Sequence, residues 1–222
     1  MAFYCLVNHD RRFITCVNPK CGCTTVKDWF NHTLAVPKPD IYGSVHEFMV
    51  PAETVATYDG YVKILIVREP LSRLVSFYYE RVVRDDQTWC FADDRHEVTL
   101  REHTFRDFLR SLAALAERGV EFQHHLVPQT PAVGTVRFDE VVRLDELDER
   151  FVAINRKIGV DYVPKHLNEH RYAAAKRPRA FDLPPSVLRE EPTHPVESFF
   201  DDELERVAGA LYRDDLHFYE SV

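Results

Sequence analysis

The sequence predicts an α/β domain of three layers with a mainly parallel central sheet. Two apolar runs, residues 13–17 and 61–67, are each followed at once by a loop and then by an amphipathic helix. The second run is almost continuously apolar and rich in β-branched residues, which is typical of a parallel strand buried on both faces. The chain of 222 residues is 45% hydrophobic, so we expect one domain, residues 1–222, around one core.

The chain is expected to begin with a hairpin, in which residues 2–7 pair with residues 13–17. The second of these strands leads into the loop of residues 18–25, and a helix is expected to follow it. Four residues of this segment recur at helical spacing: Val26, Trp29, Phe30 and Thr33. We therefore expect strand, tight loop and helix in direct succession.

The loop of residues 18–25 has the composition of a phosphate-binding site. Gly22 lets the backbone approach an anion, and the N–H groups and positive dipole end of the helix point into the loop. Lys20 adds a cation, and Thr24 and Thr25 add two hydroxyl donors. The loop is not a Walker A loop, because Lys20 precedes the glycine and Gly-x4-Gly-Lys-Ser/Thr is absent. The alternative interpretation is an ordinary β-to-α turn that carries a lysine.

A second candidate anion site follows the run of residues 61–67, which we expect to lie beside the first strand. The run ends in Arg68, and Pro70 suits the first turn of the next helix. The pattern of this helix allows Ser76 to converge with Arg68. A guanidinium and a hydroxyl make a good phosphate receptor. A structural salt bridge of Arg68 and a water-exposed Ser76 are the alternative.

The rest of the chain is assigned more coarsely. We expect an irregular stretch over 85–103, a helix over 104–119, a short strand over 135–138, an amphipathic helix over 144–158, a long proline-rich surface loop over 161–196 and a final helix over 201–213.

Charge and cysteine content limit the class of protein. The net charge of −8 argues against a nucleic-acid partner, so any anion site must be local. The N-terminal segment lacks signal-peptide features and no run approaches the length of a membrane span, so a soluble, cytoplasmic protein is expected. Five cysteines, an odd number, then indicate free thiols. Cys21 and Cys23, with His124 and His125 elsewhere, are a weak metal pattern, and no metal is expected.

Together the two loops resemble those of sulfotransferases that use 3′-phosphoadenosine 5′-phosphosulfate (PAPS). The likeness is to the Golgi-type carbohydrate sulfotransferases (sulfotransferase family 2), which include the uronyl and heparan 2-O-sulfotransferases. Residues 18–25 look like the loop for the 5′-phosphosulfate, and residues 67–78 look like the 3′-phosphate motif. Weaker similarity covers residues 122–151, in which residues 125–129 read His-Leu-Val-Pro-Gln, and residues 204–219 near the C-terminus. Leu126 stands where an aromatic residue is common, and the phosphosulfate loop carries two cysteines. The resemblance implies a P-loop-like sulfotransferase fold in a compact, soluble relative.

The resemblance also implies what the site does. PAPS would be the donor substrate, and its sulfuryl group would pass by in-line displacement to an acceptor hydroxyl on a carbohydrate or glycoconjugate, without a metal. Lys20 would stabilise charge on the bridging oxygen as the bisphosphate leaves. The donor-binding residues would be Lys20, Cys21, Gly22, Cys23, Thr24, Thr25, Arg68 and Ser76.

The general base is left open among three kinds of residue. His46 closes the segment Tyr-Gly-Ser-Val-His, which looks like the Tyr-His-Gly-His segment of the uronyl 2-O-sulfotransferases. His125 is the second candidate, and a carboxylate such as Glu47 or Asp94 is the third. A histidine suits the role because its ordinary pKa lies near neutrality.

Two other functions remain open. A nucleotide- or bisphosphate-binding regulatory protein of the same fold would keep both loops and lack transfer activity. A small-molecule phosphotransferase is disfavoured, because the Walker loop and a paired-carboxylate magnesium site are missing. The expected partner is a carbohydrate acceptor, and a homo-oligomer is compatible with the sequence.

Overall fold

The computed structural model describes residues 4–16, 18–34, 44–84, 102–130, 136–162 and 177–222. The chain forms two compact units. The first contains Met1–Glu69, Gln129–Glu169 and Phe218–Val222, and the second contains Pro70–Pro128 and His170–His217. The expectation of one domain over residues 1–222 stays a prediction, because compact packing does not say whether either unit folds alone.

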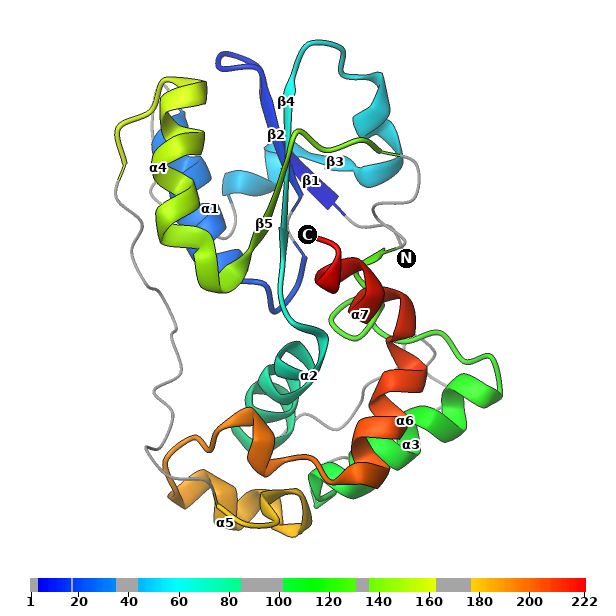
Figure 1. The fold of residues 1–222 in the computed structure, drawn as a ribbon. Coiled ribbons are helices and arrows are strands. Elements are labelled where there is room, and N and C mark those ends of the chain that lie inside the picture. The colour runs from blue at the N-terminus through cyan, green and yellow to red at the C-terminus, as the bar shows by residue number, and fades with distance from the viewer. Residues whose placement is uncertain (1–3, 17, 35–43, 85–101, 131–135, 163–176) are drawn as a thin grey trace. The chain divides into compact units, whose positions relative to one another are not determined.

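The first unit is built on a sheet of five strands in the order β3-β1-β2-β4-β5 (Figure 1). The pairs β2–β4 and β4–β5 are parallel, whereas β1 is antiparallel to both β2 and β3. Only β1 therefore opposes the other strands of this sheet, as a hairpin of β1 and β2 requires. The predicted α/β class, the mainly parallel sheet and the N-terminal hairpin are confirmed. The strands are β1 Tyr4–Asn8, β2 Phe13–Cys16, β3 Met49–Pro51, β4 Val62–Val67 and β5 Glu140–Arg143.

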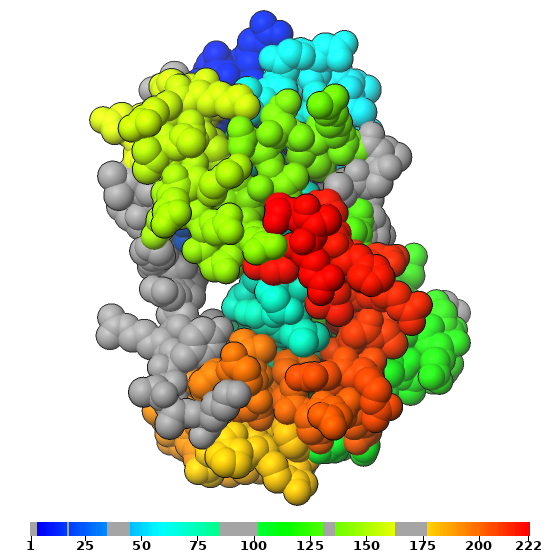
Figure 2. Space-filling view, viewed as in Figure 1, coloured from blue at the N-terminus to red at the C-terminus, as the bar shows by residue number. Residues whose placement is uncertain are grey.

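Alternate residues of the strands face two different apolar clusters, so the sheet is buried on both sides. Leu6 and Ile64 pack on the side of α1 (Cys23–Thr33) and α4 (Leu147–Ile158), which lie side by side in Figure 1. The other side is covered by the 3₁₀ helix η2 (Ala52–Thr57) and by residues of the C-terminal end. In Figure 2 these C-terminal residues, in red, lie against the green segment that contains β5.

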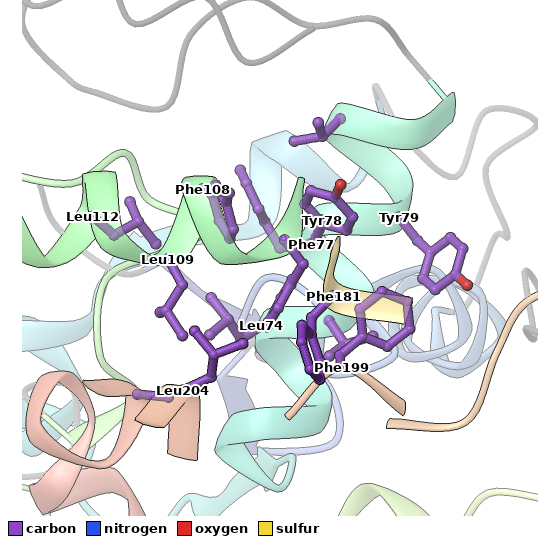
Figure 3. Packing of buried hydrophobic residues seen from close by; sticks show 14 of the residues in the cluster. Leu74, Phe77, Tyr78, Tyr79, Phe108, Leu109, Leu112, Phe181, Phe199 and Leu204 are labelled. Atoms are coloured by element: carbon purple, nitrogen blue, oxygen red, sulfur yellow. The ribbon is translucent and has the colours of Figure 1, made fainter. Parts of the chain in front are cut away.

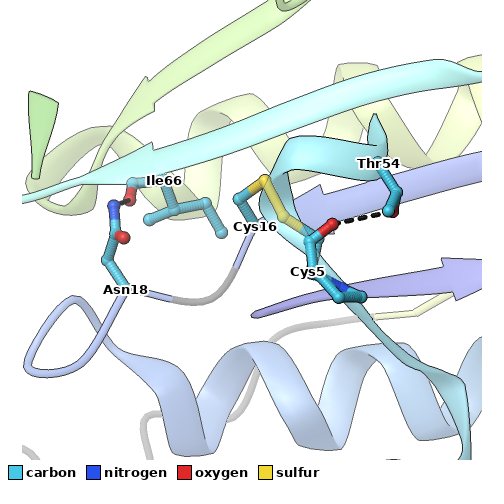
Figure 4. Close-up of a disulfide and its surroundings, with 6 residues drawn as sticks. Cys5, Cys16, Asn18, Thr54 and Ile66 are labelled. Atoms are coloured by element: carbon cyan, nitrogen blue, oxygen red, sulfur yellow. Dashed lines mark hydrogen bonds between the residues drawn. A yellow bond between two sulfur atoms is a disulfide. The ribbon is translucent and has the colours of Figure 1, made fainter. Parts of the chain in front are cut away.

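A disulfide joins β1 and β2. Cys5 and Cys16 are register partners in the hairpin, and their sulfur atoms are bonded (Figure 4). The expectation of free thiols is wrong for this pair. The register of the hairpin places the two residues opposite each other, and the spacing of the cysteines in the sequence does not show this register. Cys21 and Cys23 are thiols outside any disulfide, as expected, and Cys90 lies outside the described residues. The disulfide therefore fixes the end of β2 just before the loop.

The second unit is a helical cluster around an aromatic core (Figure 3). Phe77 stacks on Phe108 with 5.7 Å between ring centroids, and Tyr79 meets Phe199 edge to face at 5.4 Å. These contacts pack α2 against α3, and the turn that follows α2 against the segment before α6. The helices are α2 Pro70–Tyr78, continued by a π-helical turn Tyr79–Arg84, α3 Phe105–Glu117, α5 Pro185–Glu190, α6 Asp202–Leu211 and α7 Arg213–Glu220, which runs on into the C-terminal residues of the first unit.

Most of the predicted helices are confirmed. Thr104 caps α3, accepting a hydrogen bond from the Asp107 N–H. The helix expected over 144–158 forms as a 3₁₀ turn, η5 (Leu144–Glu146), followed by α4. The final predicted helix is α6, capped by Asp201.

Three expectations are wrong. Residues 136–138 are not a strand. The strand is β5, which lies at one edge of the sheet, and its polar end residues hide the alternation of apolar and polar residues. The proline-rich stretch contains α5, because Pro185 stands at a first-turn position that tolerates proline. The chain does not leave helical structure at Arg213, where α7 begins. The stretches 85–101 and 163–176 lie outside the described residues.

Arg106 connects α3 to two later segments of the second unit. Its guanidinium donates to Asp182 at 2.7 Å, to Asp201 at 2.8 Å and to Glu203 at 3.0 Å. The Leu204 N–H and then Arg106 lower the pKa of Asp201. Burial acts to raise the pKa of Asp182, but its hydrogen bonds with arginine outweigh this and leave the pKa below its ordinary value. Both carboxylates are therefore stabilised in the charged form.

Arg106→Gln should lower the free energy of unfolding by about 1 to 3 kcal/mol at pH ~7, because it removes charge-assisted hydrogen bonds. The two carboxylates have lowered pKa values in the folded state, so their contribution is present above the unfolded pKa. It is lost as the pH falls below about 4. Denaturant unfolding of the wild type and the variant, at pH ~7 and again below pH ~4, measures the difference in their free energies of unfolding.

The matched control is Arg110→Gln. Arg110 pairs with Glu203 but is 54% exposed, so its loss should cost less than about 0.5 kcal/mol. Equal losses for the two variants at neutral pH, or a loss for Arg106→Gln that does not shrink in acid, would contradict this account of the network.

Candidate active site

The loop between β2 and α1 turns through two left-handed residues, Lys20 with φ 66° and Gly22 with φ 71°. The Cys21 N–H donates to the Asn18 C=O at 3.2 Å, and the first helical hydrogen bond runs from the Val26 N–H to the Gly22 C=O at 3.0 Å. The N-cap residue of α1 is Gly22, which has no side chain to cap the helix, and the first turn carries no acidic residue. The N–H groups of that turn and the positive end of the helix dipole are therefore directed into the loop.

Gly22 is required at its position for two reasons. Its positive φ is a conformation that residues with a side chain rarely adopt. A Cβ atom at Gly22 would also lie 2.7 Å from Cδ1 of Leu144, which directly follows β5. The loop is thus packed closely against the residue that follows β5.

Arg68 directly follows β4 and contacts this loop. Its Nη1 donates to the Lys20 C=O at 3.0 Å. The strands β2 and β4 are parallel, with Cys16 opposite Leu65, so both end at the same edge of the sheet. The expectation that the run of residues 61–67 lies beside the first strand is confirmed, and the two loops follow the carboxyl ends of these strands.

Gln129 also belongs to this site, and the sequence analysis did not assign it there. Its Oε1 accepts hydrogen bonds from the Arg68 N–H at 3.0 Å and from the Cys21 thiol at 3.0 Å. Its Nε2 donates to the Arg68 C=O at 2.9 Å. The signal in the sequence was the Pro-Gln pair at the end of residues 125–129. A neutral side chain whose partners are distant in sequence gave no reason to place it at an anion site.

The family comparison agrees with this geometry. A model described as the sulfotransferase family matches residues 4–220, which is nearly the whole chain. The chain belongs to the sulfotransferase family. No curated protein and no solved structure matches it. Membership supports sulfuryl transfer in general, and the finer likeness to the uronyl 2-O-sulfotransferases stays a prediction.

The other loop residues assigned to the donor by the sequence, in this sulfotransferase-family protein, lie in the first turns of α1. Cys23 and Thr24 are half-buried, and Thr25 is buried. Asn18 begins the loop and donates through Nδ2 to the Ile66 C=O at 3.5 Å, which links the loop to β4 (Figure 4). Lys20 itself is only 8% exposed. The cation of the loop is therefore held within the unit and not out in solvent.

His46 lies in the 3₁₀ helix η1 (Ser44–Phe48) of the first unit, and its side chain is exposed. Its neighbours fix its position: Val45 is buried, and Phe48 packs on Phe30 of α1 with 5.5 Å between ring centroids. Its ring makes no hydrogen bond with any residue that the structure describes. The structure thus does not join His46 to Lys20 or Arg68. The adjacent Glu47 is also exposed.

His125 and Ser76 belong to the second unit. The Nδ1 atom of His125 lies 2.8 Å from Oε1 of Gln123, so Nδ1 carries the proton. The other ring nitrogen, Nε2, faces Nη2 of Arg81 at 3.4 Å. Burial, and then the charge of Arg81, lower the pKa of the neighbouring His124. Ser76 is buried on α2. The assigned roles of Ser76 and His125 stay predictions.

Two further observations concern the residues that the structure describes. No helix in the described ranges combines the length and the apolar character needed to cross a bilayer. Over the same ranges, no group of three or more histidine, cysteine or acidic side chains is arranged to hold a metal ion. The carboxylate Asp94, the third kind of candidate base, lies outside the described residues, as do Tyr42 and Gly43.

Gly22→Ala should cost more stability than Gly119→Ala. Both glycines have φ near 70°, so each substitution should cost about 1 to 2 kcal/mol from the left-handed backbone. Only at Gly22 would the added Cβ atom also clash with a neighbour, Leu144, because nothing lies within 4 Å of a Cβ atom at Gly119. Leu144 must then leave its rotamer, which adds about 1 kcal/mol. Denaturant unfolding of both variants measures this; equal losses would show that Leu144 does not press on the loop.

Proposed function

We propose that this protein transfers the sulfuryl group from PAPS to an acceptor hydroxyl on a carbohydrate or glycoconjugate, by in-line displacement. One observation carries the proposal: Arg68 contacts the backbone of Lys20 at 3.0 Å, beside the amino end of α1. Two cationic residues and a helix end thus meet at one edge of the sheet, in a protein whose net charge is −8. Such a local positive site suits a donor that carries phosphate at both the 3′ and 5′ positions.

In this proposal the 5′-phosphosulfate binds against the loop. The N–H groups from Gly22 onward and the hydroxyls of Thr24 and Thr25 are its donors, while Cys21 and Cys23 shape the loop around it. The Cys21 N–H is already used within the loop, in its hydrogen bond to Asn18. Arg68 binds the 3′-phosphate, and the family resemblance adds Ser76 to that role.

The reaction breaks the bond between sulfur and the bridging oxygen and forms a bond between sulfur and the acceptor oxygen. The acceptor's proton passes to a general base, and the electron pair of the broken bond stays on the leaving bisphosphate. The Lys20 ammonium stabilises the charge that develops on the bridging oxygen. No step of this scheme uses a metal.

His46 is the base that we favour. The Nε2 atom of His125 lies 3.4 Å from Nη2 of Arg81, so this nitrogen already has a hydrogen-bond partner. The exposed ring of His46 has no such partner among its described contacts and can receive a proton from an acceptor. General base catalysis requires this access.

A second function is favoured by one observation. No hydrogen bond from the described residues orients His46, whereas a catalytic histidine is usually held by a partner. A bisphosphate-binding regulatory protein without transfer activity would need no such partner. Labelled PAPS offered with a panel of carbohydrate acceptors separates the two functions: transfer of label supports the enzyme, and tight binding of PAPS without transfer supports the regulator.

The expected location in the cytoplasm also stays a prediction. The disulfide between Cys5 and Cys16 counts against this location, because such bonds persist mainly in oxidising compartments.

Arg68→Ala should weaken binding of adenosine 3′,5′-bisphosphate by about 10- to 100-fold, because Arg68 contacts a charge present throughout the reaction. Lys20→Ala should instead lower turnover by about 100- to 1,000-fold with a smaller effect on binding, because its partner charge develops in the transition state. Calorimetry and initial rates separate the two effects. Arg12→Ala, at the far end of β2, is the charge-matched control and should change neither. A Lys20→Ala variant with normal turnover would overturn the role of Lys20.

His46→Ala should lower turnover by about 100- to 10,000-fold and leave donor affinity nearly unchanged, because the base touches the acceptor and not the nucleotide. The acid limb of the pH–rate profile, measured from about pH 5 to 9, should disappear with the ring. His125→Ala is the comparison and should act mainly on acceptor binding. If His46→Ala keeps the turnover and acid limb of the wild type, the base lies elsewhere.

A further inference from the structure

We infer that Gln129 is a positioning residue that holds the two donor-binding loops in one fixed arrangement. The inference rests on the proposed function, because it assigns the loops to the two phosphate groups of one donor. Gln129 itself is 2% exposed and does not need to touch the donor. It acts through Arg68 and Cys21, which it bonds directly.

The carboxamide of Gln129 takes the place of a neighbouring strand at the end of β4. It accepts from the Arg68 N–H at 3.0 Å and donates to the Arg68 C=O at 2.9 Å. A peptide group of a paired strand would supply the same acceptor and donor. The strand β4 ends at Val67, opposite Arg143 of β5, so Arg68 lies just beyond the sheet. Gln129 thus fixes the backbone of Arg68 where regular pairing has stopped.

The same carboxamide holds the phosphosulfate loop through Cys21. The thiol donates to Oε1 at 3.0 Å, and Cys21 is 1% exposed, so water does not replace this bond. Cys21 directly follows Lys20, whose φ of 66° is unfavourable for a residue with a side chain. Such a conformation persists only where the surroundings hold it. The Cys21 thiol on one side and the Lys20 carbonyl on the other are two of the points at which it is held.

These contacts close a ring. Gln129 bonds the backbone of Arg68, the guanidinium of Arg68 bonds the backbone of Lys20, and the next residue, Cys21, bonds Gln129. A ring of this kind sets the position of Lys20 relative to Arg68. A donor with two anionic groups gains from binding both at once only when the two receptors are already correctly placed. Loss of Gln129 should therefore remove mainly the advantage of the second phosphate.

The first experiment compares binding of adenosine 3′,5′-bisphosphate and adenosine 5′-phosphate to the wild type and to Gln129→Leu. We expect Gln129→Leu to weaken bisphosphate binding by about 10- to 100-fold and monophosphate binding much less. The ratio of the two dissociation constants is the readout that a merely structural role would not move. Bisphosphate binding equal to that of the wild type would overturn the inference.

The matched control is Asn155→Leu. Asn155 is another buried carboxamide of the first unit, accepting from Trp29 Nε1 at 2.8 Å and donating to the Tyr162 C=O at 2.8 Å. It lies on α4, outside the donor loops. Its loss should lower stability and leave the ratio of dissociation constants unchanged. A change in the ratio as large as that of Gln129→Leu would show a general loosening and contradict the specific role.

Cys21 provides a milder test should Gln129→Leu not fold. Cys21→Ala leaves both bonds between Gln129 and Arg68 and should weaken bisphosphate binding by about 3- to 10-fold, whereas Cys21→Ser keeps a hydroxyl donor and should restore it. Where Gln129→Leu does fold, adding Cys21→Ala to it should change bisphosphate binding little, because the two residues share one interaction. Additive effects would contradict the ring.

The last arm needs no ligand, so it separates failure of this inference from failure of the proposed function. Iodoacetamide labelling of the native protein, located by mass spectrometry, should modify Cys21 at least about tenfold faster in Gln129→Leu than in the wild type or Asn155→Leu. If the wild type binds no bisphosphate but this difference is seen, the proposed function fails and the positioning role stands. If labelling of Cys21 is unchanged, the positioning role fails whatever the ligand.

Discussion

The parallel pairing of β2 with β4 is the constraint on which the first unit depends. It places the ends of both strands at one edge of the sheet, with Cys16 opposite Leu65. The loop that begins at Asn18 and the turn at Arg68 then meet without any further device. Antiparallel pairing of the same two strands would have put the two candidate anion sites at opposite edges. The chemistry that we propose needs them together.

The surroundings of this edge hold the loop in a conformation that it would not adopt alone. The disulfide between Cys5 and Cys16 fixes the end of β2 on one side. Leu144, at the end of β5, packs against Gly22 and leaves no room for a side chain there. Arg68 and Gln129 hold the left-handed Lys20 and its neighbour. Strain that is supported in this way is typical of sites that must be ready before the ligand arrives.

The sequence predicted those parts of the site that carry local signals. Lys20, Gly22 and Arg68 stand in short motifs directly after apolar runs, and the structure brings them together as expected. The capped helix α3 was predictable for the same reason, since Thr104 and its partner lie within one turn. These features depend on neighbours in the chain, and a reader of the sequence sees those neighbours.

The features that were missed depend on residues far apart in the chain. Gln129 reaches Arg68 across 61 positions, and its neutral side chain shows no sign of that partner. The pairing of Cys5 with Cys16 follows from the hairpin register and not from cysteine spacing. The strand β5 was misplaced because it is an edge strand, where one side of the ladder is unpaired and apolar alternation is weak.

The central claim is that one donor binds to both loops at this edge of the sheet. A crystal structure with adenosine 3′,5′-bisphosphate bound tests it most directly. The account predicts the 5′-phosphate on the N–H groups from Gly22 to Thr25, the 3′-phosphate on the guanidinium of Arg68, and Lys20 beside the 5′-phosphate. A bisphosphate bound elsewhere, or bound here without contact to either Lys20 or Arg68, would contradict it.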